Sequence, residues 1–396
     1  MKKSWPKNNP DVCIRCASCN AVCPVARVTP RFPGPKQAGP GAERFRSPNE
    51  PSVEDWIDLC MGCHLCDMVC SSGVHISELN LMARAKYLDE KGRPFRDWIL
   101  THPYLFGKLG ALFSPIINPL LKSSGVRWIV DTVLGIDKRR QMPGYQSPTF
   151  RQWFQGHSPA GDKRLAYFYG CYTNTNEPDV GKATVQVLEA NGFKVTLPPQ
   201  RCCGIPMLGN GDFNGARKMG LWNVPRLLRA VRSGLDIIFS STSCGHMIKH
   251  EYHHLLNIPG ADEVAQHTFD VFEFLRNLNG TRTPDFKDFP LKAAYFAPCH
   301  LKSLGIGFPA FEILQGIPGL HLDYIEADCC GLGGTFGFKK EKYEISEEIG
   351  KDLAEAIHRL KPEAVLSDCE GCRLQIRHLT GLKALHPIQI LRDALV

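Results

Sequence analysis

The 396-residue sequence lacks three features that would point to common classes of protein. It contains no uninterrupted apolar run of 18 residues, so a membrane-spanning helix is not expected. No apolar segment follows its opening residues, MKKSWPKNNP, and we expect no export by the general signal route. No G-x-G-x-x-G fingerprint opens a strand–turn–helix unit, so we expect no flavin or NAD on this chain.

Over most of the chain, neither basic nor acidic residues are in excess. The net charge is +7, and residues 91–155 contain ten Lys/Arg against three Asp/Glu. This local surplus of seven equals the net charge, so the remainder of the chain is close to neutral. A general nucleic-acid-binding surface is therefore not implied, and no nucleic-acid partner is expected.

Cysteine, in contrast, is abundant, and eight of the 17 cysteines fall in two runs of the same spacing. The pattern C-x-x-C-x-x-C-x-x-x-C extends from Cys13 to Cys23 and again from Cys60 to Cys70, where Ser71 replaces the usual proline. Three thiolates at steps of three hold one 4Fe–4S cubane, and the fourth ligates the other cluster in two-cluster ferredoxins. This cross-over rule predicts one ligand set of Cys13, Cys16, Cys19 and Cys70, and another of Cys60, Cys63, Cys66 and Cys23.

Two other uses of cysteine fit this spacing less well. A disulfide framework is typical of small secreted domains in oxidising compartments. A zinc ribbon uses two separated C-x-x-C pairs and does not account for a triplet with an offset fourth cysteine, twice over. The sequence therefore predicts two 4Fe–4S clusters and one-electron transfer.

The chain divides into four parts. Residues 1–90 form a mainly helical ferredoxin-type domain, with a helix at Ile76–Tyr87 and an irregular Pro/Gly-rich loop at residues 31–44. Residues 91–160 form a basic connecting segment of two or three short amphipathic helices, because its prolines prevent one long helix. Residues 161–285 and 286–396 form two lobes.

The two lobes repeat one cysteine pattern. Each has a single cysteine, then CCG, then a cysteine after a β-like run, and corresponding cysteines are offset by 128, 127 and 125 residues. Strand-like runs at 165–169, 237–240, 293–296 and 364–366 alternate with helical patterns at 180–190, 216–231 and 347–360. This rhythm predicts a site at the carboxyl ends of parallel strands. The expected fold class is α+α/β, a helical two-cluster ferredoxin domain followed by two repeated Rossmann-like lobes.

The cysteine inventories of the two lobes differ. The second lobe supplies five thiols, which are Cys299, Cys329, Cys330, Cys369 and Cys372. The first lobe supplies four, which are Cys171, Cys202, Cys203 and Cys244, with Met247 where the fifth would stand. His300, beside Cys299, either donates to a cluster sulfur or is an ordinary turn residue.

The repeated pattern resembles the cysteine-rich domain of heterodisulfide reductase catalytic subunits, glycolate oxidase iron–sulfur subunits and lactate-utilisation proteins. The strings PGPKQAGPGAER at 33–44, CCGLGGTFGFKKEKY at 329–343 and SDCEGCRLQI at 367–376 look like those of C subunits of anaerobic glycerol-3-phosphate dehydrogenases. In the reductases, five cysteines of a complete copy bind a noncubane 4Fe–4S cluster, which implies such a cluster in the second lobe. The first lobe then holds a four-cysteine cluster, recruits His246, or keeps its cysteines only as buried packing residues.

The resemblance implies a non-catalytic electron-transfer subunit of anaerobic respiration and glycerol metabolism, with no catalytic residue assigned. Its implied partners are flavin-containing dehydrogenase subunits and menaquinone. Its implied location is cytoplasmic, peripheral on the inner face of the cell membrane. The alternatives are a heterodisulfide-reductase-like or glycolate/lactate oxidase subunit with a catalytic noncubane cluster, and a structural anchor whose C-terminal cysteines are inert.

The composition of residues 91–155 also favours membrane contact, because short helices that combine basic and apolar residues lie in the headgroup plane. The basic residues expected to face anionic lipid are Lys108, Lys122, Arg127, Lys138, Arg139 and Arg140. Those expected to enter the interface are Trp98, Phe106, Phe113, Leu120, Leu121 and Trp128. Alternatively, these helices cover the flank of the lobes or dock a partner protein.

Overall fold

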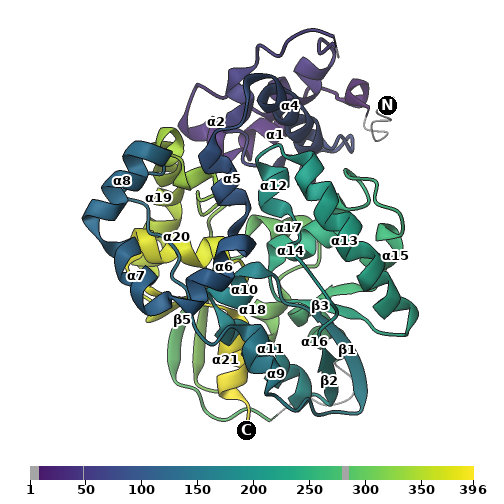
Figure 1. The fold of residues 1–396 in the computed structure, drawn as a ribbon, viewed down its shortest axis with the longest axis vertical. Helices are drawn as coiled ribbons and strands as arrows, with labels where there is room; N and C mark the ends of the chain where they lie inside the picture. The colour runs from purple at the N-terminus through teal and green to yellow at the C-terminus, as the bar shows by residue number, and fades with distance from the viewer. Residues whose placement is uncertain (1–8, 48, 279–284) are drawn as a thin grey trace.

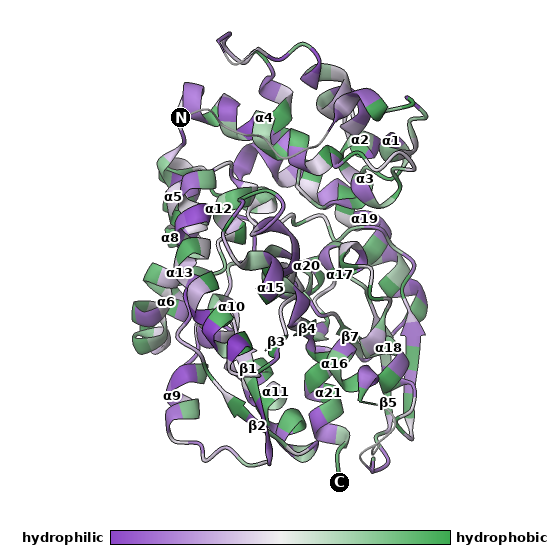
Figure 2. Ribbon diagram, turned by 90° about the vertical axis from the view of Figure 1, so that its right-hand side faces the viewer, coloured by the Kyte–Doolittle hydropathy of each residue, from purple (hydrophilic) through white to green (hydrophobic). Residues whose placement is uncertain are grey.

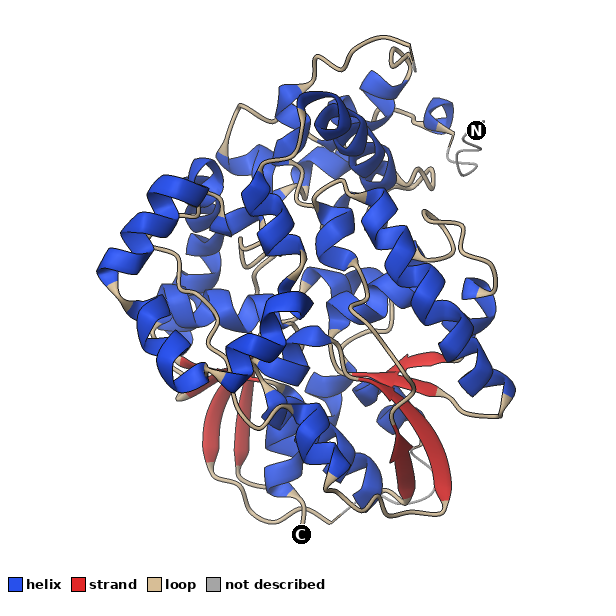
Figure 3. Ribbon diagram, in the orientation of Figure 1, coloured by secondary structure: helices blue, strands red, loops and turns tan. Residues whose placement is uncertain are grey.

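The structure is a computed structural model that describes residues 9–47, 49–278 and 285–396. The N-terminal helical part lies at the top of the molecule in Figure 1, above two lobes that each contain a sheet. The strands form two separate groups in the lower half, with helices around them (Figure 3). The first named strand begins at Lys163, so the described N-terminal portion is helical, as the predicted fold class requires.

The ferredoxin-type part is built on α4 (Ile76–Lys91), which extends four residues beyond the predicted helix. Gly92, with φ of 87°, ends the helix in a conformation that favours glycine. Leu81 and Met82 of α4 join the core of the first lobe, so this helix connects the two parts. The shorter elements are η1 (Pro10–Val12), α1 (Ser18–Ala21), α2 (Pro24–Val28), η2 (Gln37–Gly41), η3 (Asp55–Leu59) and α3 (Leu65–Met68).

The Pro/Gly-rich stretch at 31–44 is more helical than the sequence predicts. It contains the wide helical turn η2, and the chain kinks at Gly39, where φ is −85° and ψ is −105°. A Cβ at Gly39 would lie 2.7 Å from Ile76 Cγ2, so the absence of a side chain permits close packing on α4. The stretch is thus not a regular helix or strand, as the sequence predicts, because Pro40 and the kink interrupt it, but part of it is helical and not loop.

The connecting segment forms five short helices, where the sequence predicts two or three. They are α5 (Phe95–Thr101), α6 (Pro103–Leu112), α7 (Ser114–Lys122), α8 (Ser124–Leu134) and α9 (Phe150–Gln155). Proline lies in the first turn of α6 and of α7, where its missing N–H is tolerated, so these prolines mark helix starts. The segment packs along both lobes, because α6 contacts α10 (Cys171–Thr175) and Ile136 joins the core of the second lobe.

Each lobe contains a four-stranded parallel sheet, and the two sheets have the same topology. The orders are β2-β1-β3-β4 and β6-β5-β7-β8. The strands are β1 (Lys163–Phe168), β2 (Phe193–Thr196), β3 (Ile237–Phe239), β4 (Thr268–Asp270), β5 (Leu291–Tyr295), β6 (Leu320–Tyr324), β7 (Ala364–Leu366) and β8 (Lys383–Leu385). Equivalent central pairs align Ala166 with Ile237 and Ala293 with Ala364. The predicted repeat of Rossmann-like lobes is thus confirmed.

Helices cover the sheets and join the lobes. The first-lobe helices are α10, α11 (Pro178–Ala190), α12 (Ile205–Gly209), α13 (Phe213–Arg232), α14 (Thr242–His246), η4 (Met247–Glu251), α15 (Ala261–Gln266) and α16 (Val271–Asn277). The second-lobe helices are α17 (Cys299–Leu304), α18 (Pro309–Leu314), η5 (Phe336–Phe338), η6 (Lys340–Lys342), α19 (Tyr343–Leu360), α20 (Glu370–Thr380) and α21 (Pro387–Ala394). Helices α11 and α21 pack together, and one hydrophobic core contains Val187 of the first lobe and Ile388 of the second. The lobes therefore form one packed body.

Candidate iron–sulfur sites

The two N-terminal cysteine loops share one backbone conformation. Arg15 and Ala17 have φ of 61° and 65°, and Gly62 and His64, at the same positions of the second run, both have φ of 63°. Left-handed backbone is uncommon for residues other than glycine and is found where the surroundings hold it in place. Its recurrence at matching positions indicates that the two loops have the same backbone fold and present their cysteines in the same way.

One cavity gathers the thiols of the second predicted ligand set. Its lining includes Cys23, Cys60, Cys63 and Cys66, although Cys23 belongs to the first run. Cys23 lies at the start of α2, where its sulfur accepts a hydrogen bond from the Ala26 N–H. This arrangement agrees with the predicted cross-over of the fourth cysteine.

The first predicted ligand set gathers around Cys19. Cys19 is buried at the start of α1, and Cys13 and Cys70 pack against the same small cluster of residues. Burial raises the pKa of Cys19, and the neighbouring thiols of Cys13, Cys16 and Cys70 raise it further. Cys70, from the second run, is therefore close to the first, as the cross-over predicts.

The thiols of the N-terminal cavity fit an iron–sulfur cluster chemically. Burial raises the pKa of Cys23 to about 11, and burial together with neighbouring thiols raises the pKa values of Cys63 and Cys66 well above the usual value. Four converging thiols in apolar surroundings become thiolates only when a cation offsets their charge, and the irons of a cluster supply that charge. All four are free cysteines, with no disulfide among them.

The five thiols of the second lobe converge at the carboxyl ends of β5 and β7. The sulfurs of Cys330 and Cys372 are 3.3 Å apart. Hydrogen bonds from the thiols of Cys329 and Cys372 lower the pKa of Cys330 well below its usual value. Burial raises the pKa of Cys299 to about 12, and the nearby Cys330 and Cys369 add to this effect. The donor set suits an iron-rich group that takes five thiolates.

The glycine after the second cysteine pair is required by its surroundings. Gly331 has φ of 87°, and a Cβ there would lie 2.2 Å from the backbone oxygen of Ser346 in α19. Any other residue would push α19 away from the cysteine pair. The CCG motif therefore brings two adjacent thiols and a helix backbone into close contact.

The first lobe gathers only four thiols. The sulfurs of Cys171 and Cys202 are 3.8 Å apart, and Cys203 interacts with both Cys202 and Cys244. Met247 is fully buried in the same apolar cluster as Cys203 and Cys244. His246, a possible fifth ligand from the sequence, lies beside His64 and Glu251.

The separate thiol groups are neighbours in space. Cys63 of the N-terminal cavity interacts electrostatically with Cys299 of the second lobe, and Cys23, Cys60 and Cys329 belong to one packed cluster. Between the lobes, the Ser243 hydroxyl lies 3.8 Å from the Cys369 sulfur. The thiol groups thus follow one another from the N-terminal part through the second lobe to the first.

His300 bridges three parts of the molecule. Its Nδ1 lies 3.1 Å from the Ser243 hydroxyl, and the ring also interacts with the Gly62 backbone. Burial lowers the pKa of His300 to about 4, with His64 adding to this effect, so the ring is neutral at pH 7. These contacts hold the cysteine loop of residues 60–66 against both lobes. The predicted donation to a cluster sulfur stays a prediction.

The basic residues of the connecting segment are not all at the surface. Arg140 is fully buried, donating to the Gly337 carbonyl at 2.7 Å and the Ser346 hydroxyl at 3.0 Å, and it pairs with Glu347 at 3.0 Å. The expectation that Arg140 faces lipid is therefore wrong, because it fastens the segment to the second lobe. Arg139 is half exposed and pairs with Asp137 and Glu344.

The apolar residues of this segment are largely exposed. Trp128, Ile129 and Val133 of α8 are 58%, 53% and 73% exposed, and Ile116 of α7 is 63% exposed. Figure 2 shows α6 at the left edge of the molecule, with hydrophobic and hydrophilic stretches side by side on its ribbon. Within the described ranges, no single helix has the length and apolarity to cross a membrane. Helices α6 and α7 together have that length and composition, but they bend by 112° at their break.

Comparisons with known proteins agree with this architecture. The family described as "4Fe-4S dicluster domain" matches residues 10–74, and the family described as "Cysteine-rich domain" matches residues 165–249 and 293–377. These matches confirm the ferredoxin-type region and the repeated cysteine-rich region, and they support iron–sulfur clusters on this chain.

Similarity to individual proteins extends over nearly the whole chain. The C subunit of the anaerobic glycerol-3-phosphate dehydrogenase of Escherichia coli (strain K12) is 37% identical over 389 residues, which are 97% of this chain and 98% of that protein. The B subunit of the fumarate reductase (CoM/CoB) of Methanothermobacter marburgensis is 29% identical over 96% of this chain and 70% of its own length. Lactate utilization protein A of Oceanobacillus iheyensis is 29% identical over 58% of this chain and 96% of its own length.

Proposed function

This chain belongs to the family of anaerobic glycerol-3-phosphate dehydrogenase C subunits, and we propose that it passes electrons from a flavoprotein partner toward menaquinone at the membrane. Bound iron–sulfur clusters would supply one-electron transfer. The residues proposed to hold two cubanes are Cys13, Cys16, Cys19 and Cys70 for one, and Cys60, Cys63, Cys66 and Cys23 for the other. A further, noncubane cluster is proposed at the five thiols of the second lobe.

The observation that carries the proposal is the proximity of the thiol groups of the N-terminal part to those of the second lobe. Cys63 and Cys299 interact electrostatically, and Cys23 packs in one cluster with Cys329. An enzyme with one isolated reactive site does not require several thiol groups placed next to one another. A relay requires them, because electrons move between centres that lie close together.

The proposed direction leads from the ferredoxin-type part toward helix α6. Tyr104 of α6 lies close enough to Cys202 and Cys171 of the first lobe to interact with both electrostatically. Helices α6 to α8 also carry the exposed apolar residues. We propose that this side of the molecule meets the cytoplasmic membrane from its inner face, where menaquinone would accept electrons.

The complex of this chain with its flavin-containing subunits tests the proposal. When glycerol-3-phosphate is added anaerobically, we expect the cubane signals to be reduced first, followed by a menaquinone analogue in vesicles. A Cys330→Ser variant should keep flavin-to-cubane electron transfer and lose quinone reduction. Quinone reduction at the wild-type rate by flavoprotein subunits without this chain would contradict the proposal.

A second candidate is a thiol or disulfide reductase in which the five-thiol site is catalytic. The observation that favours it is that Cys299 and Cys369 are half-buried, whereas Cys329, Cys330 and Cys372 are buried. The two functions differ in one spectroscopic result. A paramagnetic signal that appears only when a thiol is added to the oxidised protein supports the reductase, and the absence of any such signal supports the relay.

A further inference from the structure

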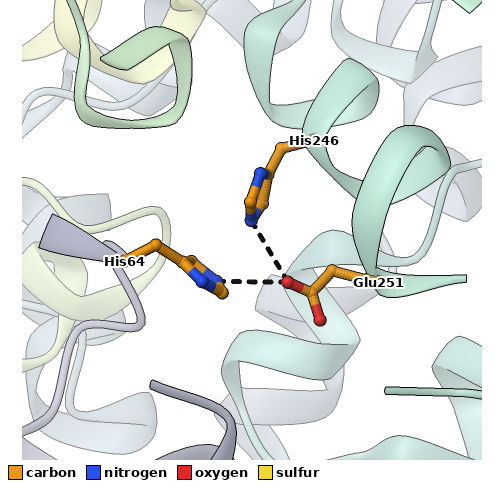
Figure 4. Close-up of side chains that lie close together, drawn as sticks. All are labelled: His64, His246 and Glu251. Atoms are coloured by element: carbon orange, nitrogen blue, oxygen red, sulfur yellow. Dashed lines mark ion pairs between the residues drawn. The ribbon is translucent and has the colours of Figure 1, made fainter. Parts of the chain in front are cut away.

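We propose that His64, His246 and Glu251 form a binding site for a divalent transition-metal ion, separate from the cysteine sites. His64 Nε2 and His246 Nε2 lie 3.2 Å and 3.1 Å from the same oxygen, Glu251 Oε1. The three ligand atoms all lie within 4.8 Å of one another. Figure 4 shows the two imidazoles reaching this carboxylate from different segments of the chain.

The three groups come from two parts of the molecule and are almost completely removed from solvent. His64 precedes α3 in the ferredoxin-type part, whereas His246 and Glu251 belong to the first lobe. Their exposed fractions are 7%, 2% and 2%. A metal ion bound here would fasten the ferredoxin-type part to the first lobe.

The hydrogen bonds of His64 place its proton on Nδ1. Ser77 Oγ donates its only proton to Asp67. The serine oxygen lies 2.7 Å from His64 Nδ1 and therefore accepts a hydrogen bond from the Nδ1–H group. Asp67 Oδ2, 3.2 Å from Nδ1, also accepts. In the neutral ring, Nε2 therefore carries a lone pair directed toward Glu251. A carboxylate behind a histidine is the usual outer partner of a metal-binding imidazole.

The hydrogen bonds of His246 have the same consequence. Ser303 Oγ donates to the His300 carbonyl at 3.0 Å and lies 3.3 Å from His246 Nδ1. The Ser303 proton is already used, so its oxygen accepts from Nδ1–H, and the lone pair of this ring too is on Nε2. With both rings in the neutral form that binds a metal, two nitrogen lone pairs and one carboxylate oxygen face one another.

Among the described residues, one of the ligand atoms and the second oxygen of the Glu251 carboxylate also lack a hydrogen-bond partner. Within the described part of the chain, neither His246 Nε2 nor Glu251 Oε2 forms a hydrogen bond, although both are buried. Burying such atoms without a partner destabilises the folded protein. A cation among the three ligand atoms would give His246 Nε2 a partner and would balance the carboxylate charges of Glu251 and Asp67.

The chemistry of the donors points to Zn²⁺ or another divalent ion of the same row that binds imidazole, such as Fe²⁺ or Co²⁺. Two imidazoles and one carboxylate suit these ions and not Mg²⁺ or Ca²⁺, which prefer oxygen ligands. Metal–ligand distances of about 2.0–2.2 Å place tetrahedral ligand atoms roughly 3.3 Å apart, close to the two separations found here. Three protein ligands leave one position for water.

The local backbone explains how His246 and Glu251, five positions apart, reach one point. Helix α14 continues directly into η4, a π-helical turn that ends at Glu251. A π turn brings residues five apart onto one face, whereas an α-helix aligns residues three and four apart. Turns of this kind are rare and frequently found at functional sites.

Metal content of the full-length chain, purified anaerobically from cells supplied with Zn²⁺ or Co²⁺, tests the proposal. Iron–sulfur clusters contain no zinc or cobalt, so these metals report on other sites. We expect one equivalent per chain, and X-ray absorption should show a nitrogen/oxygen shell at about 2.0 Å and no sulfur shell at about 2.3 Å. His246→Gln and Glu251→Gln should each lose this equivalent while their iron content stays the same.

Two controls make the result specific. His250→Gln, on the same π turn, should retain the metal, because His250 is not one of the three ligands. Cys203→Ser should also retain it, which separates this site from zinc bound by the cysteines of the first lobe. If the Gln variants fail to fold, the X-ray absorption of the wild-type chain still shows whether the metal has nitrogen/oxygen ligands or sulfur ligands. A wild-type chain with only trace zinc or cobalt, a sulfur shell, or unchanged metal in both Gln variants would overturn the proposal.

Discussion

Arg373 of the second lobe and Glu177 of the first are joined by a nearly buried ion pair, with Arg373 Nε 3.0 Å from Glu177 Oε2. Arg377 binds the other oxygen of the same carboxylate, also at 3.0 Å. Glu177 precedes α11, and Arg373 directly follows Cys372, so the pair connects the second cysteine site to the opposite lobe. We expect the relative position of the lobes to depend on it.

Glu177→Gln should lower the unfolding free energy by about 3 kcal/mol, because removing one partner of a buried pair leaves the other charge uncompensated. Thermal unfolding under anaerobic conditions would measure this loss. Arg232 and Glu263 form a matched control, since they are paired at 2.8 Å but are 63% and 39% exposed. Glu263→Gln should have little effect, because water screens an exposed ion pair, and equal losses in the two variants would contradict a special role for Glu177.

The pH dependence of this loss follows from the charge of Glu177. Burial opposes ionisation, but Arg373 and Arg377 outweigh it and lower the pKa of Glu177 below its usual value. Its stabilisation is therefore complete above the unfolded pKa of about 4.3 and is lost as the pH falls through the lower folded value. Between about pH 5.5 and 8, the stability difference between wild type and Glu177→Gln should be constant. A difference that shrinks within this window would show that another group titrates with the pair.

Cys70→Ser should damage the cluster assigned to Cys13, Cys16 and Cys19, because the fourth thiolate comes from the other run. We expect the iron content to fall by about four atoms per chain and one of two cubane signals to disappear from the reduced protein. Cys23→Ser is the reciprocal control and should remove the other signal. Loss of the same signal in both variants would disprove the cross-over.

The two lobes should respond differently to loss of a thiol. Cys372→Ser should remove the cluster signal of the second lobe and stop electron delivery to quinone, since five thiols converge there. Cys203→Ser should act mainly through stability, because Met247 fills the place of a fifth ligand. Iron analysis checks this: about 12 atoms per chain indicate three clusters and about 16 indicate four. Equal iron loss in both variants would contradict the asymmetry.

Peripheral attachment should depend on the exposed face of α8. Replacing Trp128 and Ile129, which are 58% and 53% exposed, with aspartate should reduce cosedimentation with anionic vesicles at every salt concentration, because apolar insertion is not screened. Lys122→Glu with Lys138→Glu should weaken binding mainly at low salt, by about 1 kcal/mol per residue. Leu221→Asp, 46% exposed on α13, is the control and should bind normally. A wild-type chain that stays in the supernatant at low salt would show that this face packs against a partner instead.

The sequence by itself determined the features that depend on residues close together along the chain. Cysteines spaced by three and four residues predict the N-terminal loops, because a cluster constrains a short length of backbone. The internal repeat predicted the two lobes, since β1 and β5 follow the same pattern of buried residues before a cysteine turn. Helix boundaries near Ala190 and Leu360 were also predictable, because helical periodicity is local.

Only the tertiary structure decided which residues from distant segments meet. Arg140 looks like the basic residues beside it, and its burial depends on backbone and side-chain acceptors around Gly337 and Ser346. His64, His246 and Glu251 carry no motif, because they come together only when the ferredoxin-type part docks on the first lobe. Local spacing encodes ligands that share one loop, whereas contacts across a packed interface depend on how whole elements fit together.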